Sequence, residues 1–294
     1  MALTASLTER LAEHLSQHLA RPVQIEMDQG VGGGSVNDAY RIGTNVGSYF
    51  VKVSRSGRHP NPFEAEADGL RRLVEAAAFR VPAVIASGED RDDGYLLLEW
   101  IEEGARTEAF WMTFGRSLAQ LHRHSAPAFG LDRDNYIGSL AQVNRPHASW
   151  SEFFVQCRLE PLVKMARDHL RLGDADVLRC ERLYGRLHSL FPEERPAFLH
   201  GDLWSGNFLC DTNGAPVLID PAVYFGHREM DIAMSKLFGG YEPMFYTAYQ
   251  DAWPLETGWE ERVDLCNLYP LLVHVNLFGG SYGQQVQAIL KRFT

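Results

Sequence analysis

The feature that most constrains this chain is the stretch His200-Gly-Asp-Leu-Trp-Ser-Gly-Asn207, with a further aspartate, Asp220, thirteen residues after its end. Two carboxylates and an amide thus lie on one loop and at the end of the β-run that follows it. An ordinary polar turn between Phe198-Leu199 and Phe208-Leu209 would account for one such carboxylate. It does not account for the whole pattern, which therefore predicts a functional site.

The pattern has the residue types that phosphoryl transfer requires. Every fixed position of the kinase motif His-x-Asp-Leu-x-x-x-Asn is met, by His200, Asp202, Leu203 and Asn207. In kinases the loop aspartate accepts the proton of the substrate hydroxyl. The asparagine and an aspartate after the next strand bind the Mg²⁺ that bridges the ATP phosphates. We therefore expect Asp202 to be the catalytic base, and Asn207 and Asp220 to bind Mg²⁺.

Composition limits the class of protein. A chain of 294 residues with 45% hydrophobic and 22% charged residues is typical of a soluble globular protein of one large or two medium domains. A net charge of −10 argues against nucleic acid or an anionic membrane as the main partner. Neither a signal peptide nor a membrane-spanning run is recognisable. The four cysteines are far apart, so we expect no disulfide framework and a cytoplasmic location.

A glycine cluster, at positions 30, 32, 33 and 34, separates two strand-like segments. Such a turn lets backbone N–H groups approach phosphates without a Cβ in the way. We expect Gly32, Gly33, Gly34 and Ser35 to contact the nucleotide. Ser35 stands where the motif G-x-G-x-x-G would have its third glycine, and turns use glycine routinely. The glycine cluster is therefore weak evidence alone, and its position before a lysine-bearing strand supports the nucleotide interpretation.

That lysine is Lys52, one of only four lysines against twenty-four arginines, in the strand-like Phe50-Val-Lys-Val. It is expected to bind the α- and β-phosphates of ATP and to pair with a helix glutamate. A lysine that merely protects an edge strand is the alternative. Of the two candidate partners, Glu66 lies on the apolar stripe of the next helix and Glu64 does not. An acid on an apolar stripe is costly unless it is paired, so the sequence predicts a Lys52–Glu66 ion pair.

Later in the chain, Tyr95 to Ile101 has the character of a buried strand. If the kinase interpretation holds, the backbone of Glu99, Trp100 and Ile101 hydrogen-bonds adenine. Beyond this strand the periodicity is mostly helical, over residues 110–122, 150–170, 175–190, 230–238 and 262–278.

A sheet-rich first third and a helix-rich remainder predict an α+β, bilobal, protein-kinase-like fold. We expect an antiparallel-sheet N-lobe over residues 1–102 that binds the nucleotide. A mainly helical C-lobe over residues 103–294 would carry catalysis and substrate binding, with the nucleotide in the cleft.

The segment after Asp220 favours a small-molecule kinase. Pro221-Ala222 replaces the Phe-Gly of protein kinases, and a rigid proline argues against a flipping switch. Helical sequence resumes by Met230, which leaves no room for a long activation segment. Asp231 is expected to brace the catalytic loop as a hydrogen-bond acceptor.

Two aromatic side chains are candidates for substrate contact. Trp204, two residues beyond Asp202, has a flat face that suits a sugar or a cation, although a tryptophan is more often a core anchor. His274 could line the substrate side, although a helical histidine is more often packed.

Taken together, these residues resemble the fructosamine/ketosamine-3-kinases, a branch of the aminoglycoside-kinase-like superfamily. The resemblance covers most of the chain and rests on GGGSVNDAYR (32–41), YFVKV (49–53), FEAEA (63–67), HGDLWSGN (200–207), IDPAVYFGHREMD (219–231) and LFGGY (237–241). The loop tryptophan and the Gly-His-Arg-Glu segment separate this family from the aminoglycoside and choline kinases.

This resemblance implies ATP- and Mg²⁺-dependent phosphorylation of the 3-hydroxyl of sugar adducts on amines, free or on protein lysines. That activity is a deglycating repair. It also implies that Trp204 contacts the sugar. Some members carry a redox-sensitive cysteine in the glycine-rich loop, where this chain has Ser35.

Two alternatives remain open from the residues alone. An aminoglycoside- or choline-type kinase would have the same catalytic skeleton. A nucleotide-binding pseudokinase is disfavoured, because Lys52, Asp202, Asn207 and Asp220 are all intact.

Overall fold

The computed structural model describes residues 2–32, 37–55, 62–91 and 93–294. The chain forms two compact units, which are considered separately below. The first contains residues 1–106 together with 208–220, and the second contains 107–207 and 221–294. The domains predicted from the sequence have a single boundary after residue 102, and they do not anticipate the return of 208–220 to the first unit.

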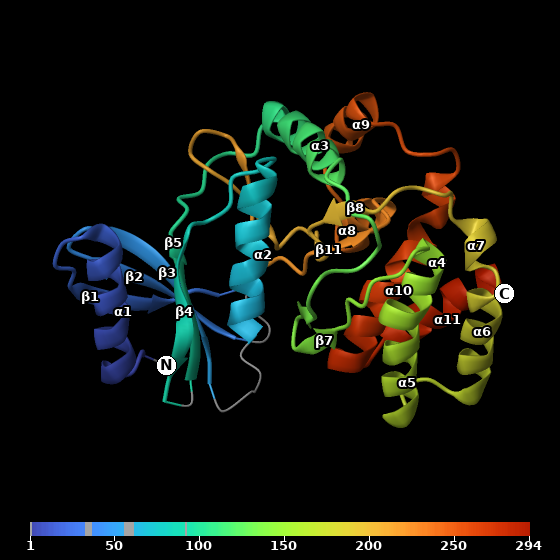
Figure 1. Ribbon diagram of the computed structural model, residues 1–294, viewed down its shortest axis with the longest axis horizontal. Helices are drawn as coiled ribbons and strands as arrows, with labels where there is room; N and C mark the ends of the chain where they lie inside the picture. Colours follow the sequence, from blue (N-terminus) through green and yellow to red (C-terminus); the bar gives the residue numbers. More distant parts are fainter. Residues whose placement is uncertain (1, 33–36, 56–61, 92) are drawn as a thin grey trace. The chain divides into compact units, whose positions relative to one another are not determined.

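A five-stranded antiparallel sheet forms the centre of the first unit, in the order β1-β2-β3-β5-β4. Figure 1 shows two helices, α1 and α2, on opposite faces of this sheet. A separate hairpin of β9 and β10 completes the unit. The elements are α1 (Ala5–Leu19), β1 (Ile25–Gly30), β2 (Asp38–Thr44), β3 (Gly47–Ser54), α2 (Pro62–Ala76), β4 (Val84–Asp90), β5 (Asp93–Glu99), β9 (Phe208–Cys210) and β10 (Pro216–Leu218).

Strand β3 shows how the sheet positions its lysine. Successive side chains of a strand point to opposite faces, and Val51 and Val53 are buried in a cluster with Leu7, Leu11 and Leu15 of α1. Lys52, between the two valines, is thereby turned to the face that α2 covers. The strand expected around Phe50-Val-Lys-Val is present as β3. Strand β4 was not predicted, because most of its side chains are only half-buried and it lacks a clear alternation.

The second unit is mainly helical. Its elements are α3 (Glu108–His122), β6 (Asn135–Ile137), β7 (Leu140–Gln142), α4 (Trp150–Phe153), the π-helical η1 (Phe154–Leu159), α5 (Glu160–Asp168), α6 (Asp174–Tyr184), α7 (Leu187–Leu190), β8 (Ala197–Leu199), β11 (Tyr224–Gly226), α8 (Glu229–Leu237), α9 (Pro243–Ala252), α10 (Trp259–Phe278) and α11 (Tyr282–Phe293). Helix α10 supplies much of the core of this unit.

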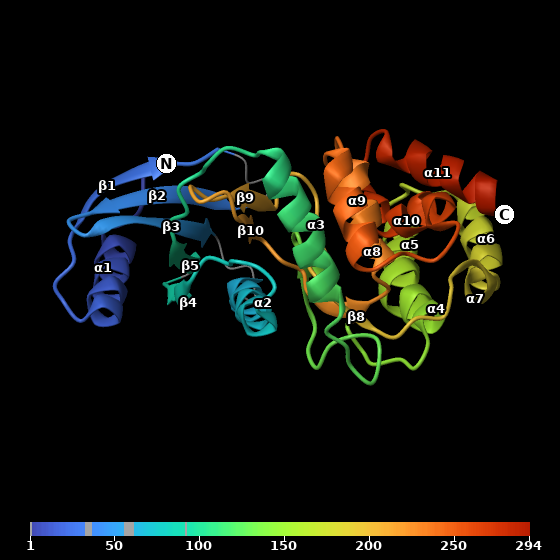
Figure 2. The same ribbon diagram turned by 90° about the horizontal axis from the view of Figure 1, so that it is seen from above.

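Some helices differ from the expected ones. Residues 150–170 form α4, η1 and α5 in succession, with a π-helical middle. Residues 175–190 are divided into α6 and α7, because the helix ends at Gly185. Helices α9 and α11 were not predicted. Figure 2 shows α9 beside α3, and a Cβ at Gly115 of α3 would lie only 2.2 Å from the carbonyl oxygen of Phe245 in α9. That close approach requires glycine.

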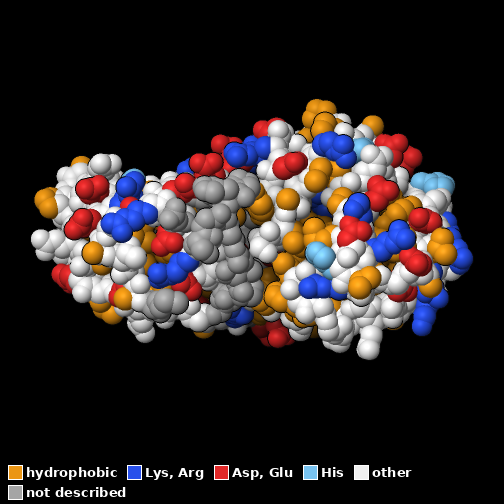
Figure 3. All heavy atoms as spheres, turned by 90° about the horizontal axis from the view of Figure 1, so that it is seen from below, with side chains coloured by type: hydrophobic (Ala, Val, Ile, Leu, Met, Phe, Trp, Pro, Cys, Tyr) orange, Lys and Arg blue, Asp and Glu red, His pale blue; other side chains and the backbone are white. Residues whose placement is uncertain are grey.

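The predicted fold class is confirmed: an antiparallel sheet comes first in the chain and a mostly helical region follows. On the face drawn in Figure 3, acidic and basic side chains are interspersed over each unit, and hydrophobic side chains gather in patches over the helical one. Across the described residues, every helix is either too short or too polar to cross a membrane.

Candidate active site

The first unit brings three of the predicted site residues into contact. Lys52 Nζ lies 2.8 Å from Oε1 of Glu66 and 2.6 Å from Oδ1 of Asp220. The lysine side chain is 11% exposed, so these are partly desolvated ion pairs. The Lys52–Glu66 pair predicted from the sequence is present. Its direct contact with Asp220 was not predicted.

The charges of this cluster do not balance. Burial alone would lower the pKa of Lys52, but the carboxylates of Asp220 and Glu66 outweigh it and raise that pKa. Lys52 therefore carries a full positive charge at neutral pH. Burial raises the pKa of Glu66, and Lys52 offsets this only in part. When both carboxyl groups are ionised, one ammonium faces two negative charges, and a bound cation would neutralise the excess.

Asp220 has an unusual backbone conformation. It lies two residues after the end of β10, with φ of 54°, in the left-handed region that residues other than glycine rarely adopt. Aspartate tolerates this region better than most residues, and such strain is concentrated at functional sites. The side chain of Asp220 is 40% exposed and can therefore offer oxygen to a ligand.

The structure does not test the other nucleotide contacts that were predicted for the first unit. Gly32 is exposed, and Gly33, Gly34 and Ser35 lie outside the described residues. Glu99 ends β5, where its backbone N–H donates to the carbonyl of Ala83 at 2.9 Å. The Arg41 guanidinium lies 4.6 Å from the ring centroid of Trp100. Ile101 is buried. Adenine recognition by residues 99–101 stays a prediction.

The loop predicted to be catalytic lies in the second unit, where Asn207 holds Asp202. The Asn207 Nδ2 donates to the backbone oxygen of Asp202 and to its Oδ2, both at 2.8 Å. Because both amide hydrogens point to Asp202, Oδ1 of Asn207 is turned away from it. Within the described residues this oxygen accepts no hydrogen bond. The sequence placed these two residues on one loop, and the structure shows that one orients the other.

Asp231 braces this loop from behind, as predicted. Its Oδ2 accepts from the backbone N–H of His200 at 2.8 Å, and its Oδ1 accepts from that of Gly201 at 2.9 Å. Asp231 is 1% exposed. His122 Nε2 lies 3.2 Å from the Asp231 carboxylate, and its Nδ1 lies 2.8 Å from the hydroxyl of Tyr249. This supporting pair was missed, although a histidine on the apolar face of a predicted helix was a signal for it.

The two aromatic candidates belong to one row of rings in the second unit. The ring centroids of Trp204 and Phe238 are 6.1 Å apart, and those of Phe238 and His274 are 4.8 Å apart. The Trp204 ring covers the backbone of Gly206, where a Cβ would lie 2.4 Å from it. His274 Nδ1 bonds the carbonyl oxygen of Pro270 at 2.8 Å, so Nδ1 carries the proton. Burial lowers the pKa of His274 and keeps it neutral.

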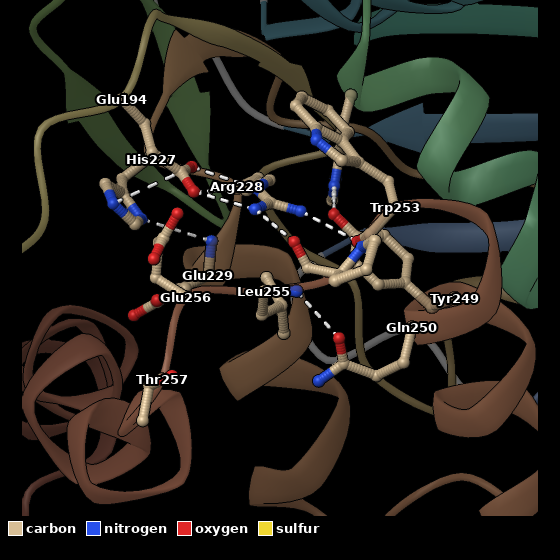
Figure 4. Close-up of polar contacts among 12 residues, drawn as sticks. Glu194, His227, Arg228, Glu229, Tyr249, Gln250, Trp253, Leu255, Glu256 and Thr257 are labelled. Carbon is tan, nitrogen blue, oxygen red and sulfur yellow. Dashed lines mark hydrogen bonds and ion pairs between the residues drawn. The ribbon is translucent and has the colours of Figure 1, made fainter.

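Arg228 anchors the start of α8, the helix that carries Asp231. Its guanidinium forms a bidentate pair with Glu194, at 2.7 to 3.0 Å, and donates to the carbonyls of Trp253 and Pro254 (Figure 4). Arg228 is 2% exposed. Burial would raise the pKa of Glu194, but the hydrogen bonds from Arg228 and the charges of nearby basic side chains together outweigh it, and the pKa is lowered.

Replacing Arg228 with methionine should lower the free energy of unfolding by about 3–5 kcal/mol, because Glu194 becomes a buried unpaired carboxylate. Urea unfolding measures this. The ionised Glu194 stabilises the native state above its ordinary pKa of 4.5, so the loss should shrink as the pH falls below that value.

Arg167→Met is the matched control. Its ion pair with Asp174, at 3.0 Å, has side chains 57% and 82% exposed, so we expect a loss below about 1 kcal/mol. Equal small losses in the two variants would mean that the Arg228 pair does not hold α8.

Among the described residues, no group of three or more His, Cys, Asp or Glu side chains could hold a metal ion alone. Mg²⁺ does not need such a group, because one or two carboxylates and the substrate phosphates usually suffice. Taken separately, the partly exposed Asp220 carboxylate and the amide oxygen of Asn207 are ligand types that Mg²⁺ accepts.

An antiparallel sheet with a buried lysine–glutamate pair, and a separate loop in which an asparagine orients an aspartate, define a phosphotransferase of the protein-kinase-like class. The comparisons with known proteins narrow the class. The chain belongs to the fructosamine kinase family, whose model matches residues 7–294. The family, the fold and the enzyme class inferred from the sequence are thereby confirmed.

Several relatives resemble the chain over nearly its full length. A protein of Enterococcus faecium named a probable ketoamine kinase is 45% identical over 267 residues, covering 89% of this chain and 93% of its own length. The chloroplastic protein-ribulosamine 3-kinase of Arabidopsis thaliana is 38% identical and covers 97% of this chain and 88% of its own length.

Solved structures of other proteins share the fold of this chain. The Thermobifida fusca protein assigned to the fructosamine-3-kinases has a TM-score of 0.86 at 34% identity, and covers 98% of this chain and 100% of its own. The aminoglycoside phosphotransferase APH(4)-Ia, in a complex with ADP and hygromycin B, shares the fold alone. Its TM-score is 0.62 at 14% identity, and it covers 95% of this chain and 97% of its own.

Proposed function

We propose that this protein transfers the γ-phosphoryl group of ATP to the 3-hydroxyl of ketoamines, the sugar adducts of amines, in free form or on protein lysines. Family membership over residues 7–294 carries this proposal. The names of the relatives supply the substrate class: ketoamines, and ribulosamine on proteins. Phosphorylation of the adduct would make the activity a deglycating repair. A cytoplasmic location fits the four cysteines, all of them free.

In this proposal Asp202 accepts the proton of the sugar hydroxyl as the hydroxyl oxygen attacks the γ-phosphorus. The hydrogen bond from Asn207 supports this role, because it fixes the carboxylate before substrate binds. Lys52 binds the α- and β-phosphates, and Glu66 holds Lys52 in place. The glycine-rich turn, Gly32 to Ser35, and the backbone of residues 99–101 would complete nucleotide binding.

Asp220 and Asn207 would hold Mg²⁺. When bound, the metal neutralises the charge of the ATP phosphates. Use of ATP is supported by structural relatives that bind ADP or a non-hydrolysable ATP analogue.

Trp204 and His274 would contact the sugar amine. Replacing Trp204 with alanine should raise KM for a ketoamine about two- to tenfold and leave KM for ATP nearly unchanged, because an aromatic face contributes about 0.5–1.5 kcal/mol to such contacts. Steady-state kinetics with each substrate varied in turn measure this. Trp111→Ala is the control, since Trp111 is a half-buried tryptophan of α3 in the same unit. Equal rises in both KM values would assign Trp204 to packing.

The direct test of function is ADP production with ribulosyl-lysine, fructosyl-lysine, kanamycin and choline side by side. We expect turnover with one or both glycated lysines. Turnover with kanamycin or choline alone would replace the proposal by an aminoglycoside- or choline-type kinase. ATP binding without turnover of any acceptor would favour a pseudokinase.

A further inference from the structure

The hairpin of β6 and β7 carries buried polar side chains that the proposed reaction does not use. Asn135 at its start pairs with Gln142 at its end, and the two are 6% and 1% exposed. Buried amides are costly unless their hydrogen bonds are made. The partners of these two amides therefore indicate what the hairpin does.

Both amides donate to the backbone just after Asp220 in the chain. Gln142 Nε2 donates to the carbonyl oxygen of Ala222 at 3.0 Å and to Oδ1 of Asn135 at 2.7 Å. Asn135 Nδ2 donates to the carbonyl oxygen of Val223 at 2.8 Å. The hairpin thus fixes two successive peptide groups of the segment that leaves Asp220.

Tyr269 of α10 sets the orientation of Gln142. Its hydroxyl donates to Gln142 Oε1 at 2.6 Å. A flipped amide would place the Gln142 oxygen against the Ala222 carbonyl, so the donors are in the orientation that satisfies every group. Tyr269 is 3% exposed, and burial raises its pKa, so its hydroxyl remains a donor at neutral pH.

A second series of hydrogen bonds connects η1 to the hairpin. Arg158, fully buried, donates from Nη2 to Oδ1 of Asn144 at 2.7 Å. Asn144 Nδ2 donates in turn to Oδ1 of Asn135 at 2.8 Å. Hydrogen bonds linked in this way polarise and strengthen one another. The network is therefore stiff where it meets Ala222 and Val223.

Ala222 in turn contacts the catalytic loop. Its N–H donates to the carbonyl oxygen of His200 at 2.9 Å. Its own carbonyl oxygen lies so close to Gly201 that a Cβ there would be 2.1 Å away. Gly201 has φ of 83°, a conformation that favours glycine. A shift of Ala222 would therefore displace Gly201, the residue before Asp202.

We propose that Gln142, oriented by Tyr269, is a positioning residue that holds Asp202 for proton abstraction by fixing the Ala222 peptide against Gly201. This inference rests on the proposed role of Asp202. Gln142 itself contacts neither substrate nor nucleotide in this account. Its effect is on the geometry of the base, and a displacement of about 1 Å can cost on the order of a hundredfold in rate.

The test is Gln142→Leu, which keeps the volume and removes the amide. We expect kcat with a glycated lysine to fall on the order of ten- to a hundredfold, with KM for ATP within about twofold of wild type. Tyr269→Phe removes one hydroxyl and keeps the ring, and it should lower kcat in the same direction by a smaller factor. If Gln142→Leu does not fold, the kcat of Tyr269→Phe tests the proposal instead.

Gln287→Leu is the control. Gln287 of α11 donates from Nε2 to the carboxylate of buried Asp176 at 2.9 Å, in the same unit and outside the network. It should lose stability and keep kcat. If Gln142→Leu and Tyr269→Phe also keep kcat, the positioning role is wrong.

A double-mutant cycle with Asp202→Asn separates positioning from general destabilisation. If Gln142 acts through Asp202, Gln142→Leu should not lower the residual rate of Asp202→Asn further, whereas independent effects would multiply. Multiplying effects would overturn the inference. If Asp202→Asn instead retains the wild-type rate, Asp202 is not the base and the proposed mechanism fails first.

Discussion

Replacing Asp202 with asparagine should greatly slow turnover of a ketoamine while ATP still binds. Asparagine has the shape of aspartate and can still accept the hydrogen bond from Asn207, but it cannot take up the proton of the sugar hydroxyl. General base catalysis contributes on the order of 10²–10⁴-fold, so we expect kcat to fall by that factor. ADP release at saturating glycated lysine measures kcat, and calorimetry measures ATP binding.

Asp174→Asn is the control for this change. Asp174 lies in the first turn of α6, and its side chain is 82% exposed. It should leave kcat within about twofold of wild type, since exposed substitutions rarely have large effects. A near-normal rate for Asp202→Asn would remove Asp202 from the role of base, and loss of ATP binding would instead indicate damage to the fold.

Replacing Lys52 with methionine should lower kcat/KM for ATP about a hundredfold. A hydrogen bond to a charged group contributes about 1.5–3 kcal/mol, and each 1.4 kcal/mol is a factor of ten. The protein should also be less stable, by about 3 kcal/mol, because Glu66 is left as a buried carboxylate without its cation. The lost ion pair with Asp220 contributes less to this destabilisation, because that side chain is 40% exposed and water screens its charge.

Lys164→Met controls for the loss of a lysine. Lys164 pairs with Asp168 at 2.5 Å, but its side chain is 76% exposed. ATP kinetics and unfolding should both stay close to wild type. If Lys52→Met lowers stability and leaves KM for ATP unchanged, the lysine holds the first unit together and does not bind phosphate.

Much of the candidate site could be predicted because its residues lie at fixed short spacings. Asp202 and Asn207 share one loop, and the choice of Glu66 over Glu64 followed from the helical period. The Lys52–Glu66 pair is present at 2.8 Å. Nucleotide contacts by Gly33, Gly34 and Ser35 remain predictions, as do the roles of Trp204 and His274 in binding substrate.

Elements with weak patterns could not be predicted. Strand β4 has mostly half-buried side chains, whereas the second half of β3 is buried. Over residues 150–170, the helical periodicity carried no signal for the π-helical η1, in which Arg158 is buried. Local periodicity reports which face is buried, and it does not report how the backbone hydrogen bonds are arranged.

By itself the sequence determined the family, the order of sheet and helices, and the loop that carries the proposed base, because spacing along the chain fixes which side chains share a turn or a face. Only the tertiary structure decided that Asp220 pairs with Lys52, and that Gln142 bonds the carbonyl of Ala222, a residue 80 positions away. Contacts between residues so far apart depend on how buried polar groups find partners, and no local pattern encodes that choice.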